Sequence, residues 1–115
     1  DKDKTTCWLT KNNVPADEKW LLIEFEKEEF IKSISIINGL AANEDLYYDN
    51  HRVKNVILTF SDETNKEIKF KDNILDFQKF ELNKKTKSIK ILVTDIYQGS
   101  KFDDICISEI EVEAK

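Results

Sequence analysis

The sequence predicts an all-β protein, a sandwich or jelly roll of seven or eight strands. Three observations lead to this fold class. Apolar and polar residues alternate with period two through most of the chain, and no amphipathic stretch is long enough to form a structural helix. The 115 residues, 40% of them hydrophobic and 36% charged, suit one thin two-layer core with a well-solvated surface. We therefore expect one domain over residues 1–115, as an excerpt of a longer chain.

The predicted strands each place apolar side chains on one face. They cover residues 20–26, 30–38, 52–61, 65–71, about 76–82, 87–97 and 105–113. Ile34 and Ile36 share a face that continues to Asn38. Within residues 52–61, Val56 and Leu58 likewise share one face. Half-buried strands on two packed sheets produce this pattern.

The connections between strands carry turn residues. Residues 61–65 are a tight polar link that predicts a hairpin, and residues 84–85 and 98–100 mark two further connections. The longest interruption, residues 40–51, has room for one helical turn at 43–48. The only glycines, Gly39 and Gly99, predict special backbone positions.

Bulk charge limits the partners. The net charge is −5 and the pI about 5.0, with basic residues scattered among acidic ones, which argues against nucleic acid and against an anionic membrane surface. No apolar run is long enough to span a bilayer.

The residues that catalysis would need are poorly arranged. His51 is the only histidine, and it lies in a polar loop without serine or cysteine beside it. The side chains of Asp103 and Asp104 diverge if that segment is extended, so they cannot flank one bond as a hydrolase pair does. There is no glycine-rich phosphate loop. We expect a protein that is not an enzyme.

Hard oxygen ligands gather near both ends of the chain, as calcium requires. They are Asp1, Asp3, Thr5 and Thr6 in the opening turn and Asp104 or Glu109 near the last strand. The plainer interpretation is an acidic turn and a strand with a solvated glutamate.

The two cysteines, Cys7 and Cys106, lie at opposite ends of the chain. A bridge between them would close a loop of nearly the whole chain, worth roughly 4–5 kcal/mol in the loop-entropy model. Two separate buried thiols are the equal alternative. Zinc is excluded, because a structural zinc site needs four nitrogen or sulfur ligands.

Two loops collect residue types that bind sugars, namely aromatic faces together with planar donors and acceptors. The first loop contributes Asn38, Glu44, Asp45, Tyr47, Tyr48, Asn50, His51, Arg52 and Lys54, and the second contributes Tyr97, Gln98, Lys101 and Phe102. On composition alone, a merely solvated pair of loops is the favoured interpretation of these residues.

Five motifs in order resemble the discoidin, or coagulation-factor C-type, superfamily of galactose-binding-like jelly rolls. They are the opening at 1–8, the strand at 20–25, Ile37-Asn38-Gly39, the segment 50–54 and the segment 97–110. Within the superfamily they are most similar to the NAD glycohydrolase translocation-type, glycan-binding discoidin-like domain.

The resemblance implies a mainly antiparallel jelly-roll β-sandwich whose termini lie close together. It also implies a structural calcium held by Asp1, Asp3, Thr6 and Glu109, although Lys2 replaces the glycine of the family's turn and Lys4 adds a second positive charge there.

The function we expect is a non-catalytic glycan-binding module of a secreted or surface bacterial protein, monomeric in isolation, for adhesion or targeting. Its ligand-binding set is Asn38, Tyr47, Tyr48, Asn50, His51, Arg52, Tyr97 and Lys101. The alternative is a protein-interaction or translocation module that docks another chain or domain through the same loops. Phospholipid binding through Leu46 and the two tyrosines of the first loop is a third hypothesis, which the net charge opposes.

Overall fold

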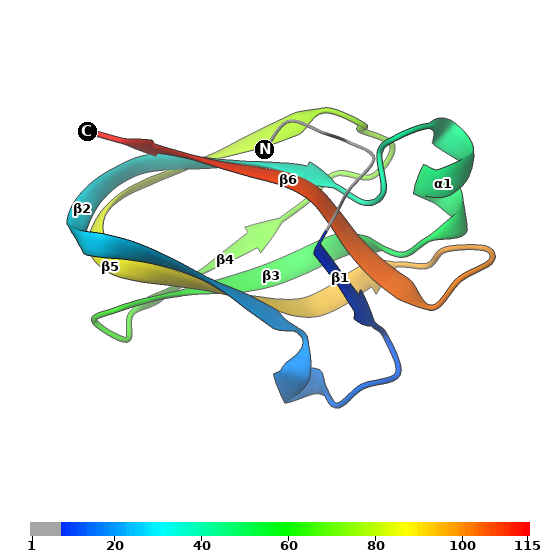
Figure 1. The fold of residues 1–115 in the computed structure, drawn as a ribbon, viewed down its shortest axis with the longest axis horizontal. Helices are drawn as coiled ribbons and strands as arrows, with labels where there is room; N and C mark the ends of the chain where they lie inside the picture. Colours follow the sequence, from blue (N-terminus) through cyan, green and yellow to red (C-terminus); the bar gives the residue numbers. More distant parts are fainter. Residues whose placement is uncertain (1–7) are drawn as a thin grey trace.

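The computed structural model describes residues 8–115 and confirms the all-β fold (Figure 1). Its strands are β1 (Trp8–Lys11), β2 (Trp20–Asn38), β3 (Arg52–Phe60), β4 (Asn65–Lys69), β5 (Phe77–Tyr97) and β6 (Asp104–Ala114). A 3-10 turn, η1 (Ala16–Glu18), and one short helix, α1 (Glu44–Asp49), complete the described elements. The strands form a six-stranded antiparallel sheet in the order β1-β6-β2-β5-β3-β4.

This sheet makes two layers because β2 and β5 bend together. Trp20 to Glu24 pair with residues 88–92 of β5, and Glu29 to Ile37 pair with residues 77–86, with a register shift between the two blocks. Figure 1 shows both strands curving around one end of the molecule. The first half of β2, the second half of β5, β3 and β4 form what we call the β3 layer. The second half of β2, the first half of β5, β6 and β1 form the β6 layer.

The bends explain the difference between six strands and the seven or eight expected. Residues 20–26 and 30–38 are the two halves of β2, and residues 76–82 and 87–97 belong to the two halves of β5. The predicted connection at residues 84–85 is therefore wrong, because these residues lie inside β5. β1 is a strand that the sequence pattern did not reveal.

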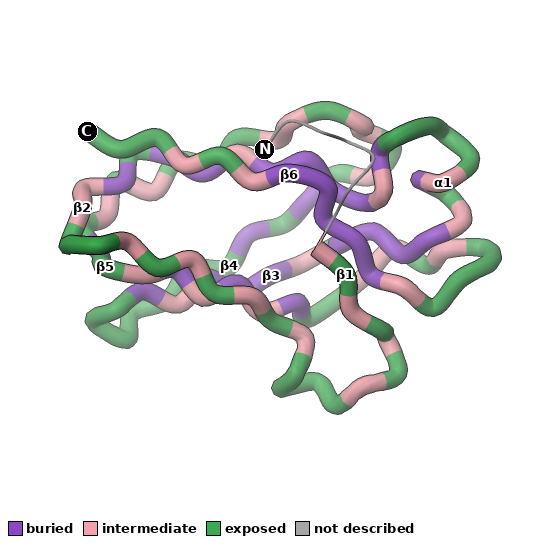
Figure 2. The backbone as a smooth tube through the Cα atoms, in the orientation of Figure 1, coloured by how far each residue is buried: buried purple, intermediate pink, exposed green. Residues whose placement is uncertain are grey.

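The predicted alternation places the core correctly. Ile34, Ile36, Val56 and Leu58 are fully buried between the layers, and the buried parts of the chain concentrate in β3, β6 and the second half of β2 (Figure 2). Burial of these aliphatic side chains is the main stabilising contribution to the sandwich.

The predicted turns at 61–65 and 98–100 are confirmed, and the helical turn expected at 43–48 is α1. The Asn43 side chain caps α1 by accepting a hydrogen bond from the backbone N–H of Leu46 at 2.9 Å. Gly39 has a φ of +71°, which L side chains rarely adopt. Among residues 8–115, no helix is long and apolar enough to cross a membrane.

Candidate functional site

Three segments meet where β3 and β6 begin, and we call this region the loop end: α1, residues 70–76 and residues 98–103. The backbone N–H groups of Lys101 and Phe102 donate to the carbonyl of Asp49 at 3.1 and 2.8 Å. The N–H of Ser100 donates to the carbonyl of Tyr48 at 3.0 Å. The two loops that the sequence singled out are thus joined by backbone hydrogen bonds.

An ion pair between Arg52 and Asp72 braces the loop end. Nη2 and Nε of Arg52 donate to the two Asp72 carboxylate oxygens at 2.7 and 3.1 Å, in the bidentate geometry that suits guanidinium. Nη1 of Arg52 donates to the carbonyl of Gln98 at 3.2 Å. Burial opposes ionisation of Asp72, but hydrogen bonds led by Arg52 outweigh it, so the pKa of Asp72 lies below its ordinary value. Arg52 therefore links residues 70–76 to residues 98–103.

Tyr47 and Tyr48 extend this brace from α1. The buried Tyr47 hydroxyl donates to Asp72 Oδ1 at 3.0 Å and accepts from the N–H of Asn73 at 3.1 Å. Burial and the Asp72 carboxylate raise the pKa of Tyr47 to about 12. The Tyr48 hydroxyl donates to Asn73 Oδ1 at 2.7 Å, and the Arg52 guanidinium lies 5.2 Å from each tyrosine ring centroid.

His51 is buried between the loops and uses both ring nitrogens internally. The N–H of Gly99 donates to Nδ1 at 2.8 Å, which assigns the proton to Nε2, and Nε2 donates to Asp103 at 3.1 Å. The hydrogen bond from His51 lowers the pKa of Asp103. His51 thus fastens residues 98–103 to the start of β3.

Two buried asparagines serve the backbone. The Asn38 side chain donates to the Val53 carbonyl at 2.6 Å and accepts from the Val53 N–H at 2.8 Å, as a neighbouring strand would. Asn50 donates from Nδ2 to the carbonyl of Leu46 at 2.9 Å and so closes α1. Neither side chain presents its amide to solvent.

The predicted ligand-binding residues therefore fall into two groups. The interior group comprises Asn38, Tyr47, Asn50, His51 and Arg52. Tyr97 is half-buried, and its hydroxyl donates to the Phe70 carbonyl at 2.7 Å. Tyr48 and Lys101 lie at the surface, where Phe102 joins them. Ligand binding by this set stays a prediction. The interior group is buried, so its members can act only by holding the surface residues in place.

The surface of the loop end is shallow. A hollow of about 250 Å³ is lined by His51 and residues 98–103, and the residues of α1 do not contribute to it. Backbone hydrogen bonds hold the two loops against each other. The loops therefore form one continuous rim, with no deep cavity between them in the described part of the chain. Small-molecule sites are usually deeper and more apolar.

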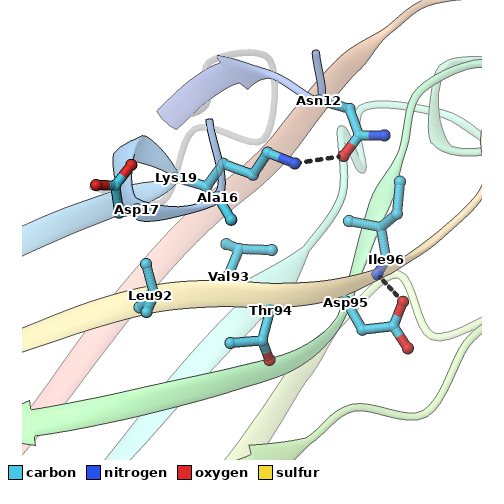
Figure 3. Close-up of a pocket in the computed structure, with 9 residues that line it drawn as sticks. All are labelled: Asn12, Ala16, Asp17, Lys19, Leu92, Val93, Thr94, Asp95 and Ile96. Carbon is cyan, nitrogen blue, oxygen red and sulfur yellow. Dashed lines mark hydrogen bonds between the residues drawn. The ribbon is translucent and has the colours of Figure 1, made fainter. Parts of the chain in front are cut away.

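A second hollow of about 500 Å³ lies away from the loop end, between residues 12–19 and the last part of β5 (Figure 3). Its apolar lining residues are Ala16, Leu92, Val93 and Ile96. Lys19 Nζ donates to Asn12 Oδ1 at 3.1 Å across its rim. Its lining residues offer no nucleophile with an adjacent base, the arrangement that covalent catalysis requires.

The calcium and disulfide predictions depend on residues outside the described part of the chain. Asp1, Asp3, Thr6 and Cys7 all lie there, whereas Glu109 and Cys106 are buried in β6. Within residues 8–115, no group of three or more His, Cys, Asp or Glu side chains is placed to hold a metal ion. The calcium site and the Cys7–Cys106 disulfide therefore stay predictions.

Sequence reasoning missed Asp72 and Asn73, which anchor Arg52 and both tyrosines. They follow the strand predicted at 65–71 and read as ordinary turn residues. Since Arg52 precedes Asp72 by twenty residues, no local spacing signalled the pair.

The chain matches one known protein family and is similar in fold to several solved structures. A family model described as the NAD glycohydrolase translocation F5/8 type C domain matches residues 1–113. The fold is similar to the translocation domain of the Streptococcus pyogenes NAD+-glycohydrolase, with 23% identity, a TM-score of 0.65, and coverage of 93% of this chain and 96% of that one. It is also similar to part of the mycobacterial arabinofuranosyltransferase AftD, with 14% identity, a TM-score of 0.72, and coverage of 100% of this chain and 9% of that one. No curated protein sequence matches the chain.

Proposed function

Because this chain belongs to the NAD glycohydrolase translocation F5/8 type C domain family, we propose that it is a non-catalytic interaction module that docks another protein chain or domain through the loop end. The proposed role is to help translocate the protein that carries it. We further propose that this protein is bacterial and secreted or surface-bound, and that the isolated domain is monomeric. The resemblance to this family that the sequence motifs predicted is confirmed.

The observation that carries the proposal is a pair of exposed aromatic side chains on a rigid, shallow surface. Tyr48 is 39% and Phe102 44% exposed, and the backbones of their segments are hydrogen-bonded together. Aromatic residues are enriched in protein interfaces, and a preorganised surface loses little conformational entropy on binding. A shallow braced rim suits a protein surface better than a small ligand.

The buried network explains why the surface is preorganised. Arg52 and His51 each connect different loops of the loop end, and their polar atoms are already paired. These side chains cannot turn outward to read a ligand without leaving buried polar partners unsatisfied, which costs free energy. Recognition therefore falls to Tyr48, Phe102 and Lys101.

Photo-crosslinking tests the proposal in the full-length parent protein. A photoreactive phenylalanine analogue replaces Phe102, and in a control it replaces Leu9, which is 52% exposed on β1. We expect crosslinks to another polypeptide, or to another domain of the parent, from position 102 only. They should persist in excess galactose and disappear when Tyr48→Ser is added. Equal crosslinking from position 9, or none from position 102, would contradict the proposal.

Glycan binding remains the second candidate, favoured by one feature of the same surface. The exposed Tyr48 ring lies beside the Asn73 amide that holds its hydroxyl, and an aromatic face next to a planar amide suits a sugar ring. A glycan array with the intact domain, with and without calcium, tests it. Binding that Tyr48→Ala abolishes would support glycan recognition, and the absence of any bound glycan would end this candidate.

A further inference from the structure

The first half of β2 is a sheet edge with no strand beside it among residues 8–115. β2 pairs with β6 only from Ile31 to Asn38, so β5 is the one neighbouring strand of residues 20–28 within the described chain. Trp20 to Glu24 pair with β5 in register, and a register shift separates them from Glu29. A strand edge of this length leaves a row of unpaired backbone N–H and C=O groups that can pair with another chain.

Of the other described edges, β1 and β4 are short, the first half of β5 is contacted by side chains, and residues 108–114 of β6 continue beyond β1 as a further edge. β1 has four residues and β4 has five, with lysines at positions 66 and 69 of β4. On the first half of β5, the Gln78 side chain bonds to both backbone groups of Lys71 at 3.0 and 2.9 Å. Lys66 Nζ donates to the carbonyl of Glu81 at 2.6 Å. Short edges, lysines and covering contacts are the usual protections against strand addition.

The core is only partly covered next to the open edge. Ile110 and Val112 of β6 lie opposite Ile36 and Ile34, so they face the interior. They are nevertheless half-buried, whereas Ile34 and Ile36 are fully buried. The β3 layer ends at β2 and stops short of covering this part of β6.

The inward-facing apolar side chains of residues 20–28 are also only partly buried. Leu21, Ile23 and Phe25 face the core but are half-buried, and in Figure 2 this half of β2 alternates between intermediate and exposed. One further strand beside β2 would cover both apolar rows at once, and burial of apolar area would favour its addition.

The outward side of the edge strand sets the chemistry of its partner. Trp20 and Leu22 are 40% and 45% exposed, and they are followed on the same strand by exposed Glu24, Glu26 and Glu28. Exposed Lys27 lies between the last two, and Glu28 also pairs with Lys85 at 3.6 Å. A strand that pairs here meets two apolar side chains at one end and a row of carboxylates at the other. Opposite charges across a strand pair stabilise it, and like charges destabilise it.

We propose that a basic, extended segment of a partner polypeptide adds as a strand to residues 20–28 of β2 and extends the β3 layer over β6. Its inward side chains are aliphatic and cover Ile110 and Val112. Its outward side chains are lysine or arginine next to the glutamates. A second copy of this chain fits less well, because it brings the same glutamates and the same net charge of −5. The surface differs from the loop end, so this inference stands apart from the proposed function.

A nine-residue peptide of alternating valine and lysine is the probe, measured by titration calorimetry and by amide hydrogen exchange on the wild-type chain. We expect binding with slowed exchange confined to residues 20–28. A peptide N-methylated at alternate backbone positions keeps its side chains but loses strand pairing, so we expect it to bind at least tenfold more weakly.

Variants locate the site. Leu22→Lys together with Glu24→Lys should weaken peptide binding at least tenfold, because a lysine-bearing edge resists strand addition. Leu9→Lys, on the outward side of β1, should leave binding unchanged. Equal binding of the N-methylated peptide, protection outside residues 20–28, or no binding at millimolar peptide would each overturn the proposal. So would a concentration-dependent dimer that Leu22→Lys disrupts, because it would make a second copy the occupant.

Discussion

At the scale of single residues, polar side chains that look like ligand readers in the sequence instead hold the protein together. Arg52 illustrates this, since its buried guanidinium depends on the Asp72 carboxylate for neutralisation. Removing one partner of such a pair leaves an uncompensated buried charge, which is strongly destabilising. The surface of the loop end is rigid because these side chains are fully engaged.

The substitution Asp72→Asn should lower the free energy of unfolding by about 3–5 kcal/mol, measured by urea denaturation. Arg52→Lys keeps the charge but loses the bidentate geometry, so we expect a smaller loss. Glu113→Gln is the matched control, because Glu113 forms an exposed pair with Lys32 at 3.5 Å and should contribute less than about 1 kcal/mol. Equal effects of Asp72→Asn and Glu113→Gln would show that the brace is unimportant.

Tyr47 should make the protein sensitive to alkali. Its folded-state pKa of about 12 lies above the ordinary tyrosine value, so the neutral hydroxyl stabilises the fold. This stability is fully present below pH ~10 and is lost as the pH rises toward the folded-state value. Between pH 9 and pH 12, the Tm should fall more steeply for the wild type than for Tyr47→Phe. The variant also loses a hydrogen bond at every pH. Parallel pH curves for the two proteins would refute this role of Tyr47.

At the scale of elements, close backbone approaches set the loop end. A Cβ added at Gly99 would lie 2.4 Å from the Asn50 carbonyl carbon. Gly99→Ala must therefore push residues 98–103 away from β3 and weaken the hydrogen bond from the Gly99 N–H to His51. We expect a loss of about 1–3 kcal/mol in unfolding free energy and faster amide exchange at residues 100–102.

Ser100→Ala serves as the control for Gly99→Ala, since the Ser100 side chain is exposed and its hydroxyl makes only long hydrogen bonds, at 3.3 Å, to Tyr48 and Asp49. It should change stability by less than about 1 kcal/mol. If Gly99→Ala is as well tolerated, the close approach of the two loops is not maintained in solution.

The elements that the sequence predicted well are those in which alternation and burial agree. In β3 the period-two pattern marks the inward face from Val56 to Phe60, whereas in β6 residues 105–109 are all buried and alternation begins only at Ile110. The continuity of β2 and β5 could not be predicted, because the bends depend on pairing between residues far apart in the chain. The roles of Asn38 and His51 were hidden for the same reason, since their partners Val53, Gly99 and Asp103 are brought near only by the fold.

At the scale of the whole molecule, the two ends of the chain remain the place to test for calcium. The predicted site of Asp1, Asp3, Thr6 and Glu109 would add stability by binding only the folded state, about 2.7 kcal/mol at a calcium concentration of one hundred times Kd. Calcium should then raise the Tm of the wild type relative to a chelator control, and Glu109→Gln should abolish the rise. No calcium-dependent shift, or an equal shift in Glu109→Gln, would show that the predicted residues do not hold calcium.

The molecule offers two separate surfaces, the loop end and the open edge of β2, and the loop end is the proposed docking surface. Its most direct test is the Kd of the partner that photo-crosslinking identifies, measured with the purified proteins. Buried aromatic residues often dominate interface energy, so Tyr48→Ser and Phe102→Ser should each weaken binding by about tenfold or more. Leu22→Lys, on the open edge, should leave Kd unchanged. If Tyr48→Ser and Phe102→Ser bind like the wild type, the loop end is not the docking surface.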